Sequence, residues 1–260
     1  MDILRVENLC KVYGKGDTAV RALDNVSFTI QKGDFVAIVG PSGSGKSTLL
    51  HILGGVDTPS SGKVYIDNTD VYSLSETNLA IFRRRQIGLI YQFFNLVPVL
   101  NVEENITLPL LLDGRKVDKA FLNDLTGTLG LRERLRHLPN QLSGGMRQRC
   151  ALIRTLATSP DVLLLDEPFS ALDYQTRLAV SGDIAQIIRR EHKTALLVTH
   201  DISEAISLSD RIVVLTHRPA TVKAIHDLGA LRAVPSLQRR SRAEFQTLFN
   251  QIWEELDVNA

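Results

Sequence analysis

"GPSGSGKST" (residues 40–48) decides the fold of this chain, because it joins the apolar run FVAIV (35–39) to a helical segment that begins LLHIL. It matches the pattern G-x-x-x-x-G-K-[ST] in the strand-to-helix context that the pattern requires. Glycines in the loop let successive backbone N–H groups point inward, and the following helix adds its positive N-terminal end. We therefore expect the loop to bind a polyphosphate. An ordinary glycine turn between strand and helix is the alternative.

Every residue of this loop is a candidate for nucleotide binding. Lys46 is expected to reach the β- and γ-phosphates, and the Ser47 hydroxyl is expected to hold Mg²⁺. The predicted phosphate-binding residues are Gly40, Pro41, Ser42, Gly43, Ser44, Gly45, Lys46, Ser47 and Thr48. A nucleotide loop alone leaves kinases, GTPases and motors open.

A second candidate segment is DVLLLDEPFSALD, which starts at residue 161. Its apolar run is typical of a central parallel strand, and the run ends in two acids. Alternation along a strand puts these carboxylates on different sides. We expect Asp166 to bind Mg²⁺ and Glu167 to polarise an attacking water as general base. An acidic strand end solvated in a loop is the alternative.

Composition narrows the class of protein. The chain has 260 residues, 30 basic and 29 acidic, and a formal net charge of +1. This balance argues against a whole-protein attraction to nucleic acid, so no nucleic-acid partner is expected. Two cysteines, Cys10 and Cys150, are too few for a disulfide framework, and we expect both to be buried and inert. The sequence contains no run of 18 apolar residues, so we expect neither a membrane span nor an export signal.

The segment QLSGGMRQR (141–149) gives the sequence its family resemblance. With it, nearly the whole chain to about Pro219 resembles the ATP-binding cassette family, the ATPase subunits of ABC transporters. The resemblance implies that Ser143, Gly144 and Gly145 form a second phosphate-binding turn, which closes on ATP held by another subunit. The active unit would be a head-to-tail pair with two ATPs between the subunits. Met146 stands where the commonest family form has glutamine, and a turn-capped surface helix is the alternative.

The resemblance also implies roles for four single residues. They are Tyr13 (stacking on adenine), Gln92 (sensing Mg²⁺ and the γ-phosphate), His200 (contacting the γ-phosphate and ordering the water) and Asp173 (communicating across the pair). Three of them have an ordinary structural alternative: half-buried packing for the tyrosine, a turn for the glutamine, and a satisfied structural role for the histidine. Six motifs in the expected order are far more specific than any one of them.

The fold class predicted is α/β: a P-loop NTPase parallel-sheet core with an antiparallel β lobe and an inserted helical subdomain. We assign residues 1–92 and 159–219 to the ATP-binding core with its lobe, and residues 93–158 to the helical signature subdomain. Residues 220–260 are expected to form a C-terminal strand and an amphipathic helix, with apolar residues at helical spacing in RAEFQTLFNQIWEEL. That helix is expected to pack against its own core, with a partner contact as the alternative.

Transmembrane permease subunits are the second kind of partner that the resemblance implies. The apolar segment FFNLVPVLNVEEN follows Gln92 and resembles the family's docking surface for the membrane subunit. Most of these side chains are expected to fill the helical subdomain's own core. We hypothesise that Phe94 and Leu96 line the dock. The chain would then be cytoplasmic and peripheral at the inner face of the cell membrane through its partners.

The two halves of the chain resemble different branches of the family. The N-terminal half is similar to ATPases of lipoprotein-release, macrolide-efflux and bacitracin-resistance systems, and the C-terminal half to nitrate, sulfonate and taurine importers. A chimera is one hypothesis and a natural intermediate branch is the other. A single natural relative that spans both halves end to end would remove the chimera hypothesis.

Two arginine-rich stretches are interpreted as solvated. Arg83–Arg85 is expected to be a solvated helix end. Before the C-terminal helix, four arginines without intervening acids suit a solvated linker or, as the alternative, anionic lipid heads. These are Arg232, Arg239, Arg240 and Arg242.

The predicted function is ATP hydrolysis that energises transport through membrane subunits, with ATP and Mg²⁺ as cofactors. A soluble cassette ATPase acting on ribosomes or DNA competes with it, but those resemble two cassettes in one chain or a cassette split by a coiled coil. A third possibility is a cassette that binds ATP and hydrolyses it poorly. Intact Glu167 and His200 argue against evolved inactivity.

Overall fold

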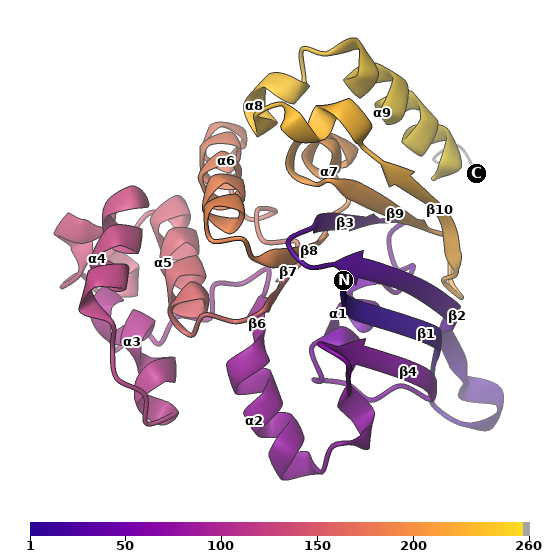
Figure 1. The fold of residues 1–260 in the computed structure, drawn as a ribbon, viewed down its shortest axis with the longest axis horizontal. Coiled ribbons are helices and arrows are strands. Elements are labelled where there is room, and N and C mark those ends of the chain that lie inside the picture. Colours follow the sequence, from indigo (N-terminus) through magenta and orange to yellow (C-terminus); the bar gives the residue numbers. More distant parts are fainter. Residues whose placement is uncertain (257–260) are drawn as a thin grey trace.

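The computed structural model describes residues 1–256, and these residues form two β-sheets with helices packed around them (Figure 1). Residues 257–260 of the predicted C-terminal unit lie outside the described residues. The smaller sheet is antiparallel, with order β2-β1-β4-β5. Its strands are β1 (Asp2–Tyr13), β2 (Val20–Gln31), β4 (Ser61–Ile66) and β5 (Thr69–Asp70).

The larger sheet has the order β10-β9-β3-β8-β7-β6. All neighbours are parallel except β10, which pairs antiparallel with β9 and forms an edge of the sheet. The strands are β3 (Phe35–Val39), β6 (Ile87–Ile90), β7 (Val162–Asp166), β8 (Thr194–Val198), β9 (Arg211–Leu215) and β10 (Val222–Asp227). The predicted α/β class with a parallel core and an antiparallel lobe is confirmed.

The helices lie around both sheets. They are α1 (Lys46–Leu53), α2 (Glu76–Gln86), α3 (Val102–Leu112), α4 (Lys119–Thr128), α5 (Gly144–Ala157), α6 (Tyr174–Arg190), α7 (Ile202–Leu208), α8 (Ser236–Arg239) and α9 (Ala243–Glu255). Figure 1 places α3, α4 and α5 together beyond the β6 edge of the sheet, and α8 and α9 near the opposite edge. The segment 93–158 contains no strand among these described elements and holds α3 to α5.

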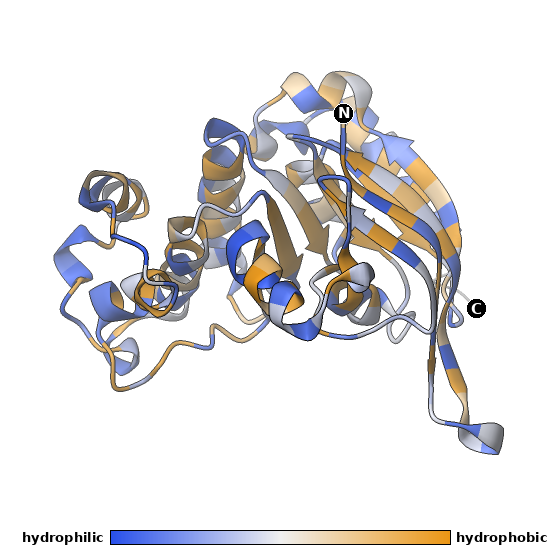
Figure 2. Ribbon diagram, turned by 60° about the horizontal axis from the view of Figure 1, so that its bottom comes forward, coloured by the Kyte–Doolittle hydropathy of each residue, from blue (hydrophilic) through white to orange (hydrophobic). Residues whose placement is uncertain are grey.

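Continuous apolar runs explain the central strands. All residues of β3, β7 and β8 are buried, as expected of strands covered on both faces. Figure 2 shows these central strands as hydrophobic ribbon inside more polar helices. Because β3, β8 and β7 are parallel neighbours, the residues that follow them meet at the carboxyl ends of these strands. The phosphate loop, the paired acids and His200 all lie there.

The loop after Gln92 is held by buried polar contacts and not only by apolar packing. Asn105 of α3 is fully buried; its Oδ1 accepts from the Val97 N–H at 2.7 Å, and its Nδ2 donates to the Leu100 carbonyl at 2.8 Å. Arg154 of α5 donates to the carbonyl of Phe94 at 2.9 Å. These bonds fix the path of the loop between the sheet and the helical segment.

The structure divides the apolar side chains of this loop between the core and the surface. Phe94 and Leu96 are partly buried against the core, so they contribute mainly to packing. The side chains that point outward are Phe93, 71% exposed, and Val99, 78% exposed. The apolar residues of this segment show no regular period, so the sequence could not separate the inward side chains from the outward ones.

Two other expectations change. Arg84 and Arg85 are partly exposed, but they pair with the carboxylate of Asp113 at the end of α3 at 2.7 and 3.1 Å, so this helix end is not merely solvated. Their bonds hold the pKa of Asp113 below its usual range. Cys150 is buried, with its pKa raised to about 12 by that burial, whereas Cys10 is only half-buried. The inert character expected of Cys150 follows from its burial.

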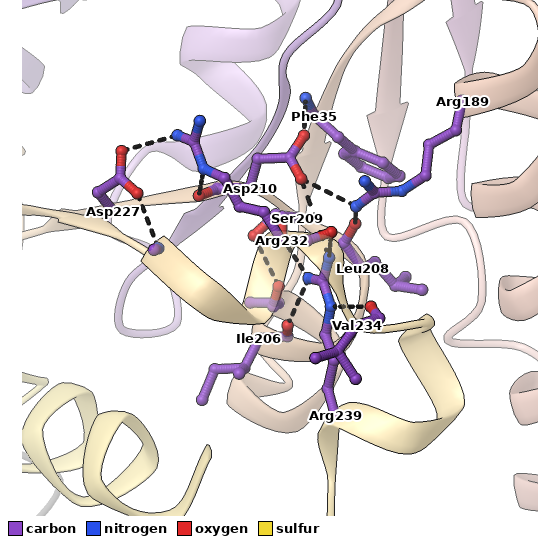
Figure 3. Close-up of polar contacts among 12 residues, drawn as sticks. Phe35, Arg189, Ile206, Leu208, Ser209, Asp210, Asp227, Arg232, Val234 and Arg239 are labelled. Atoms are coloured by element: carbon purple, nitrogen blue, oxygen red, sulfur yellow. Dashed lines mark hydrogen bonds and ion pairs between the residues drawn. The ribbon is translucent and has the colours of Figure 1, made fainter. Parts of the chain in front are cut away.

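The C-terminal segment is tied to the core by a buried arginine (Figure 3). The guanidinium of Arg239 is fully buried and donates to the carbonyls of Ile206, Ser209 and Val234. Arg232 donates to the Asp227 carboxylate at 2.7 Å. The interpretation of these arginines as a solvated linker is therefore wrong for Arg239, which is a structural donor.

Helix α9 packs against the core of the same chain. Phe245 and Ile252 are buried in a cluster with residues of β3, α7 and β9, and Leu248 and Phe249 are partly buried beside them. His226 of β10 and Glu255 of α9 are in contact at 2.7 Å. The amphipathic pattern is explained mainly by internal packing, and β10 is a strand within the segment where a C-terminal strand was expected.

Candidate active site

The phosphate loop has the backbone that an anion site requires. Gly43 and Gly45 have φ of +70° and +111°, a region that L side chains rarely adopt. A Cβ on Gly45 would also meet the Ala22 carbonyl oxygen at 2.9 Å. The first intrahelical bond of α1 is donated by Leu49 to Gly45, so the N–H groups of residues 46–48 precede the helical ladder. These groups can receive a phosphate.

Lys46 is a buried cation at the centre of the loop. Lys46 is only 6% exposed, and its Nζ donates to the carbonyls of Gly40 and Pro41, both at 2.8 Å. Burial lowers its pKa below the ordinary value for lysine. Nearby, the Ser44 Oγ is buried and has no hydrogen-bond partner within residues 1–256. An unpaired donor beside a buried ammonium fits a polyphosphate ligand.

Ser47 and Asp166 meet across the junction of α1 and β7. The Ser47 hydroxyl donates to Asp166 Oδ1 at 3.0 Å. Burial raises the pKa of Asp166 above its ordinary value. His51 Nε2 lies 3.8 Å from Asp166 Oδ2. A hydroxyl and a carboxylate oxygen side by side form a donor set that suits Mg²⁺, so the residues present fit that ion.

Glu167 and His200 come from the ends of the neighbouring strands β7 and β8. His200 Nδ1 lies 3.2 Å from Glu167 Oε2. Glu167 has φ of +43°, an uncommon backbone for a residue with a side chain, and its N–H donates to the Val198 carbonyl at 2.9 Å. The strained backbone turns the Glu167 side chain toward the histidine instead of continuing the strand alternation.

Tyr13 is the last residue of β1 and is 42% exposed. Its hydroxyl donates to Asp57 Oδ2 at 2.6 Å and lies 3.5 Å from Thr48 Oγ1. Lys11 Nζ bonds the other oxygen of Asp57 at 2.6 Å and lies 4.7 Å from the centre of the Tyr13 ring. Burial and the bond to Asp57 raise the pKa of Tyr13. The ring is thus an exposed platform that is fixed at its polar end.

Sequence reasoning missed Asp57 and Lys11. Asp57 follows α1 in a loop, and Lys11 lies in β1, 46 residues away in the chain. Lysine in a strand of this kind usually points to solvent, and this one is nearly buried. The only local signal was the alternation of β1, which places Lys11 and Tyr13 on the same face.

The signature turn and Asp173 are both helix caps. Ser143 Oγ accepts from the Met146 N–H at 3.3 Å, and α5 begins at Gly144. Asp173 Oδ1 accepts from the Thr176 N–H at 3.0 Å and caps α6. Backbone bonding from Thr176 lowers the pKa of Asp173.

Gly145 has a packing role that the sequence did not predict. It is buried, and a Cβ there would approach Thr176 Cγ2 to 2.7 Å. Ser143 is exposed, whereas Gly144 is half-buried. Thr176 therefore contacts both Gly145 and the Asp173 cap, which joins the signature turn and the loop 170–173 into one surface.

The structure does not bring all predicted site residues together in one chain. Gln92 is exposed, two residues beyond β6, in the segment that leads to the helical region. Among the hydrogen bonds and ion pairs of residues 1–256, none joins residues 143–145 to residues 40–48. The loop, the paired acids and His200 form one group, and the signature turn and Asp173 form another.

Comparison with known proteins identifies the class. A family model described as ABC transporter matches residues 23–170. The chain belongs to this family. It is 39% identical over 260 residues to the uncharacterised ABC transporter ATP-binding protein YtlC of Bacillus subtilis, covering 99% of this chain and 96% of the relative. It is 43% identical over 210 residues to the lipoprotein-releasing system ATP-binding protein LolD of Bordetella avium, covering 80% of this chain and 91% of the relative.

A solved structure agrees with this assignment. The dimeric, post-hydrolysis structure of the ATP-binding cassette MJ0796 bound to ADP and Pi has a TM-score of 0.76 and 37% identity, covering 86% of this chain and 98% of the other. The protein is an ATP-hydrolysing nucleotide-binding subunit of an ABC transporter. No helix within residues 1–256 is long and apolar enough to cross a membrane.

The comparisons do not support a chimera. The alignment with YtlC covers 99% of this chain and therefore spans both halves. This is the observation expected of a natural end-to-end relative. The LolD likeness agrees with the lipoprotein-release branch expected for the N-terminal half. An importer branch for the C-terminal half is not confirmed.

Proposed function

We propose that the carboxyl ends of β3, β8 and β7 form a hydrolytic site for MgATP. Residues 40–48 bind the phosphates, and Lys46 neutralises their charge. Asp166 and Ser47 would hold Mg²⁺, which when bound would neutralise charge on the β- and γ-phosphates. The observation that carries the proposal is the pairing of two contacts at adjacent strand ends: Ser47 with Asp166 at 3.0 Å and Glu167 with His200 at 3.2 Å.

Glu167 is proposed as the general base for the attacking water. Its carboxylate is partly buried and faces the His200 ring. The imidazole can therefore hold the carboxylate in the orientation in which it accepts a proton from water. His200 would also donate toward the γ-phosphate. Gln92 would add a contact when the helical segment approaches the core, since it lies at the junction of the two. Tyr13 would stack on the adenine.

The active unit is proposed to be a head-to-tail pair. The exposed Ser143 and the half-buried Gly144 lie in a different group from the phosphate loop, so one chain supplies two half-sites. The N-terminal end of α5, a helix of 14 residues, is suited to an anion. In the pair, this turn would close on ATP held by the second subunit. The dimeric structure of MJ0796 supports association of such cassettes.

Permease subunits are the proposed membrane partners, and they would hold the chain at the inner face of the cell membrane. The exposed Phe93 and Val99 follow Gln92 and are suited to an apolar contact. Phe93→Asp should abolish co-purification with the membrane subunits of the host cell while ATP binding remains. Equal loss of co-purification and of ATP binding would contradict the hypothesis that this surface contacts the permease. The likeness to LolD, which belongs to a lipoprotein-releasing system, favours export, and the resemblance of the C-terminal half to importers leaves import as the second candidate.

The test is steady-state ATP hydrolysis by the full chain across protein concentration, beside the variant Glu167→Gln. Turnover should rise more than proportionally with concentration, and the variant should lose about 100-fold or more in turnover while still binding ATP. The variant should also form a dimer in ATP and Mg²⁺. Glu191→Gln is the matched control, because its side chain is 25% exposed, as is that of Glu167. A Glu167→Gln variant that keeps its turnover would overturn the assignment.

A further inference from the structure

Helix α9 forms one wall of a groove whose other wall is the start of the phosphate loop. The groove has a volume of about 600 Å³. From the loop it is lined by Pro41 and Ser42, from the end of β8 by His200, and from α9 by Phe249, Trp253 and Leu256. The C-terminal helix therefore borders the candidate active site directly. The proposed ATPase mechanism makes no use of this wall.

The aromatic wall is held in a fixed position. The Phe249 and Trp253 rings are stacked, with centroids 6.0 Å apart and 17° between their planes. One face of α9 is buried through Phe245 and Ile252, and its end contacts His226 of β10. Upstream, the buried Arg239 ties α8 to the end of α7 (Figure 3). Trp253 is nevertheless 43% exposed, so it is an anchored aromatic with an open face.

The groove has the composition of an interface core. One charged side chain, that of Asp201, is among its lining residues. Its carboxylate is already used: Oδ1 accepts from the Glu204 N–H at 3.0 Å, and Oδ2 lies 3.8 Å from Arg177. Few free charges and stacked aromatic rings are typical of the central part of a protein–protein interface.

We propose that a second copy of this chain fills the groove when ATP closes the pair, so that Trp253 and Phe249 become part of the dimer interface. The inference rests on the proposed head-to-tail pair. The groove is continuous with the surface over which that pair closes, because Pro41, Ser42 and His200 belong to both. A cassette that closes over the phosphate loop must cover the adjoining wall as well. The C-terminal helix then adds to the affinity of the ATP-bound pair.

Trp253 is the single tryptophan of the chain, so its fluorescence reports on this groove alone. The experiment uses the full-length Glu167→Gln variant, with mass and tryptophan emission measured in the same ATP and Mg²⁺ titration. We expect the emission to move to shorter wavelength and acrylamide quenching to fall in step with the dimer fraction. A dimer with unchanged emission and quenching would overturn the inference and leave the proposed function standing. If no dimer forms, both fail.

A substitution tests the energetic contribution. In the same background, Trp253→Glu should raise the dissociation constant of the ATP-bound dimer about tenfold or more, because aromatic residues at interface centres are costly to lose. ATP binding to the monomer should not change. Ile225→Glu is the matched control, since Ile225 of β10 is also 43% exposed and does not line the groove. Equal weakening by both variants would contradict a specific contact. Should Trp253→Glu fail to fold, the fluorescence titration still decides.

Discussion

His200 Nδ1 lies 3.2 Å from Glu167 Oε2, so a histidine from the end of β8 and a glutamate from the end of β7 form one unit. If the imidazole orients the carboxylate, its loss should impair chemistry more than binding. We expect His200→Ala to lower kcat about 100-fold with little change in the Kd for ATP. Both are measured on the full chain. His137→Ala, a histidine of the helical region, should leave kcat unchanged; a rise in Kd as large as the fall in kcat would contradict the orienting role.

The Tyr13 platform can be separated into its ring and its hydroxyl. Tyr13→Ala removes the stacking surface and should weaken ATP binding about tenfold, within the range measured for base–aromatic stacking. Tyr13→Phe keeps the ring and loses the hydroxyl contacts with Asp57 and Thr48, so its effect should be about twofold. Fluorescent nucleotide titration gives both values. If Phe and Ala weaken binding equally, the ring does not stack on the base.

Glu204 of α7 gives the folded chain a pH dependence. Glu204 is only 6% exposed, and burial raises the pKa of its carboxyl to about 7. Because the folded-state pKa lies above the unfolded value, folded Glu204 binds the proton more tightly. Its contribution to stability is present below about pH 4 to 5 and is lost as the pH rises to about 7.

The variant Glu204→Gln isolates this contribution. Its free energy of unfolding, relative to the parent chain, should increase by up to about 3 kcal/mol between pH 5 and pH 8. Urea unfolding of both proteins at several pH values measures the difference. Parallel stability curves for the two chains would show that the Glu204 carboxyl titrates normally.

The fold could be predicted from the sequence because its main signals are local. The runs at residues 35–39, 162–165 and 195–198 are apolar throughout, and a residue of the site follows each of them within two positions. Parallel strands bring such ends together without further information. The phosphate loop, Asp166, Glu167 and His200 could therefore be placed in advance.

The residues that the sequence did not reveal depend on contacts between distant segments. The Lys11–Asp57 pair needs β1 to lie beside the loop after α1, and the Thr176 contact that requires glycine at position 145 needs α5 to pack on α6. Likewise, nothing near Arg239 in the chain predicts that it donates to the carbonyls of Ile206 in α7 and Ser209 just after it. Amino-acid patterns report local periodicity, and these contacts are long-range.

Arg239 should be a point of weakness for the whole C-terminal segment. Arg239→Ala removes a buried donor from several carbonyls at once, and we expect a loss of about 3 kcal/mol in the free energy of unfolding. Amide hydrogen exchange in α9 should accelerate. Arg240→Ala is the neighbouring control, because Arg240 is half-exposed and bonds only side chains, Ser207 and Tyr174. Equal losses from the two variants would mean that burial of Arg239 contributes nothing.

Lys46 makes both of its hydrogen bonds with carbonyls of its own loop, Gly40 and Pro41. A buried ammonium without partners would strongly destabilise a folded chain. In the proposed site, these two carbonyls would remain as acceptors for the Lys46 ammonium after phosphate has left. Product release would then exchange one set of oxygen acceptors for another, and the buried cation would keep hydrogen-bond partners between turnovers.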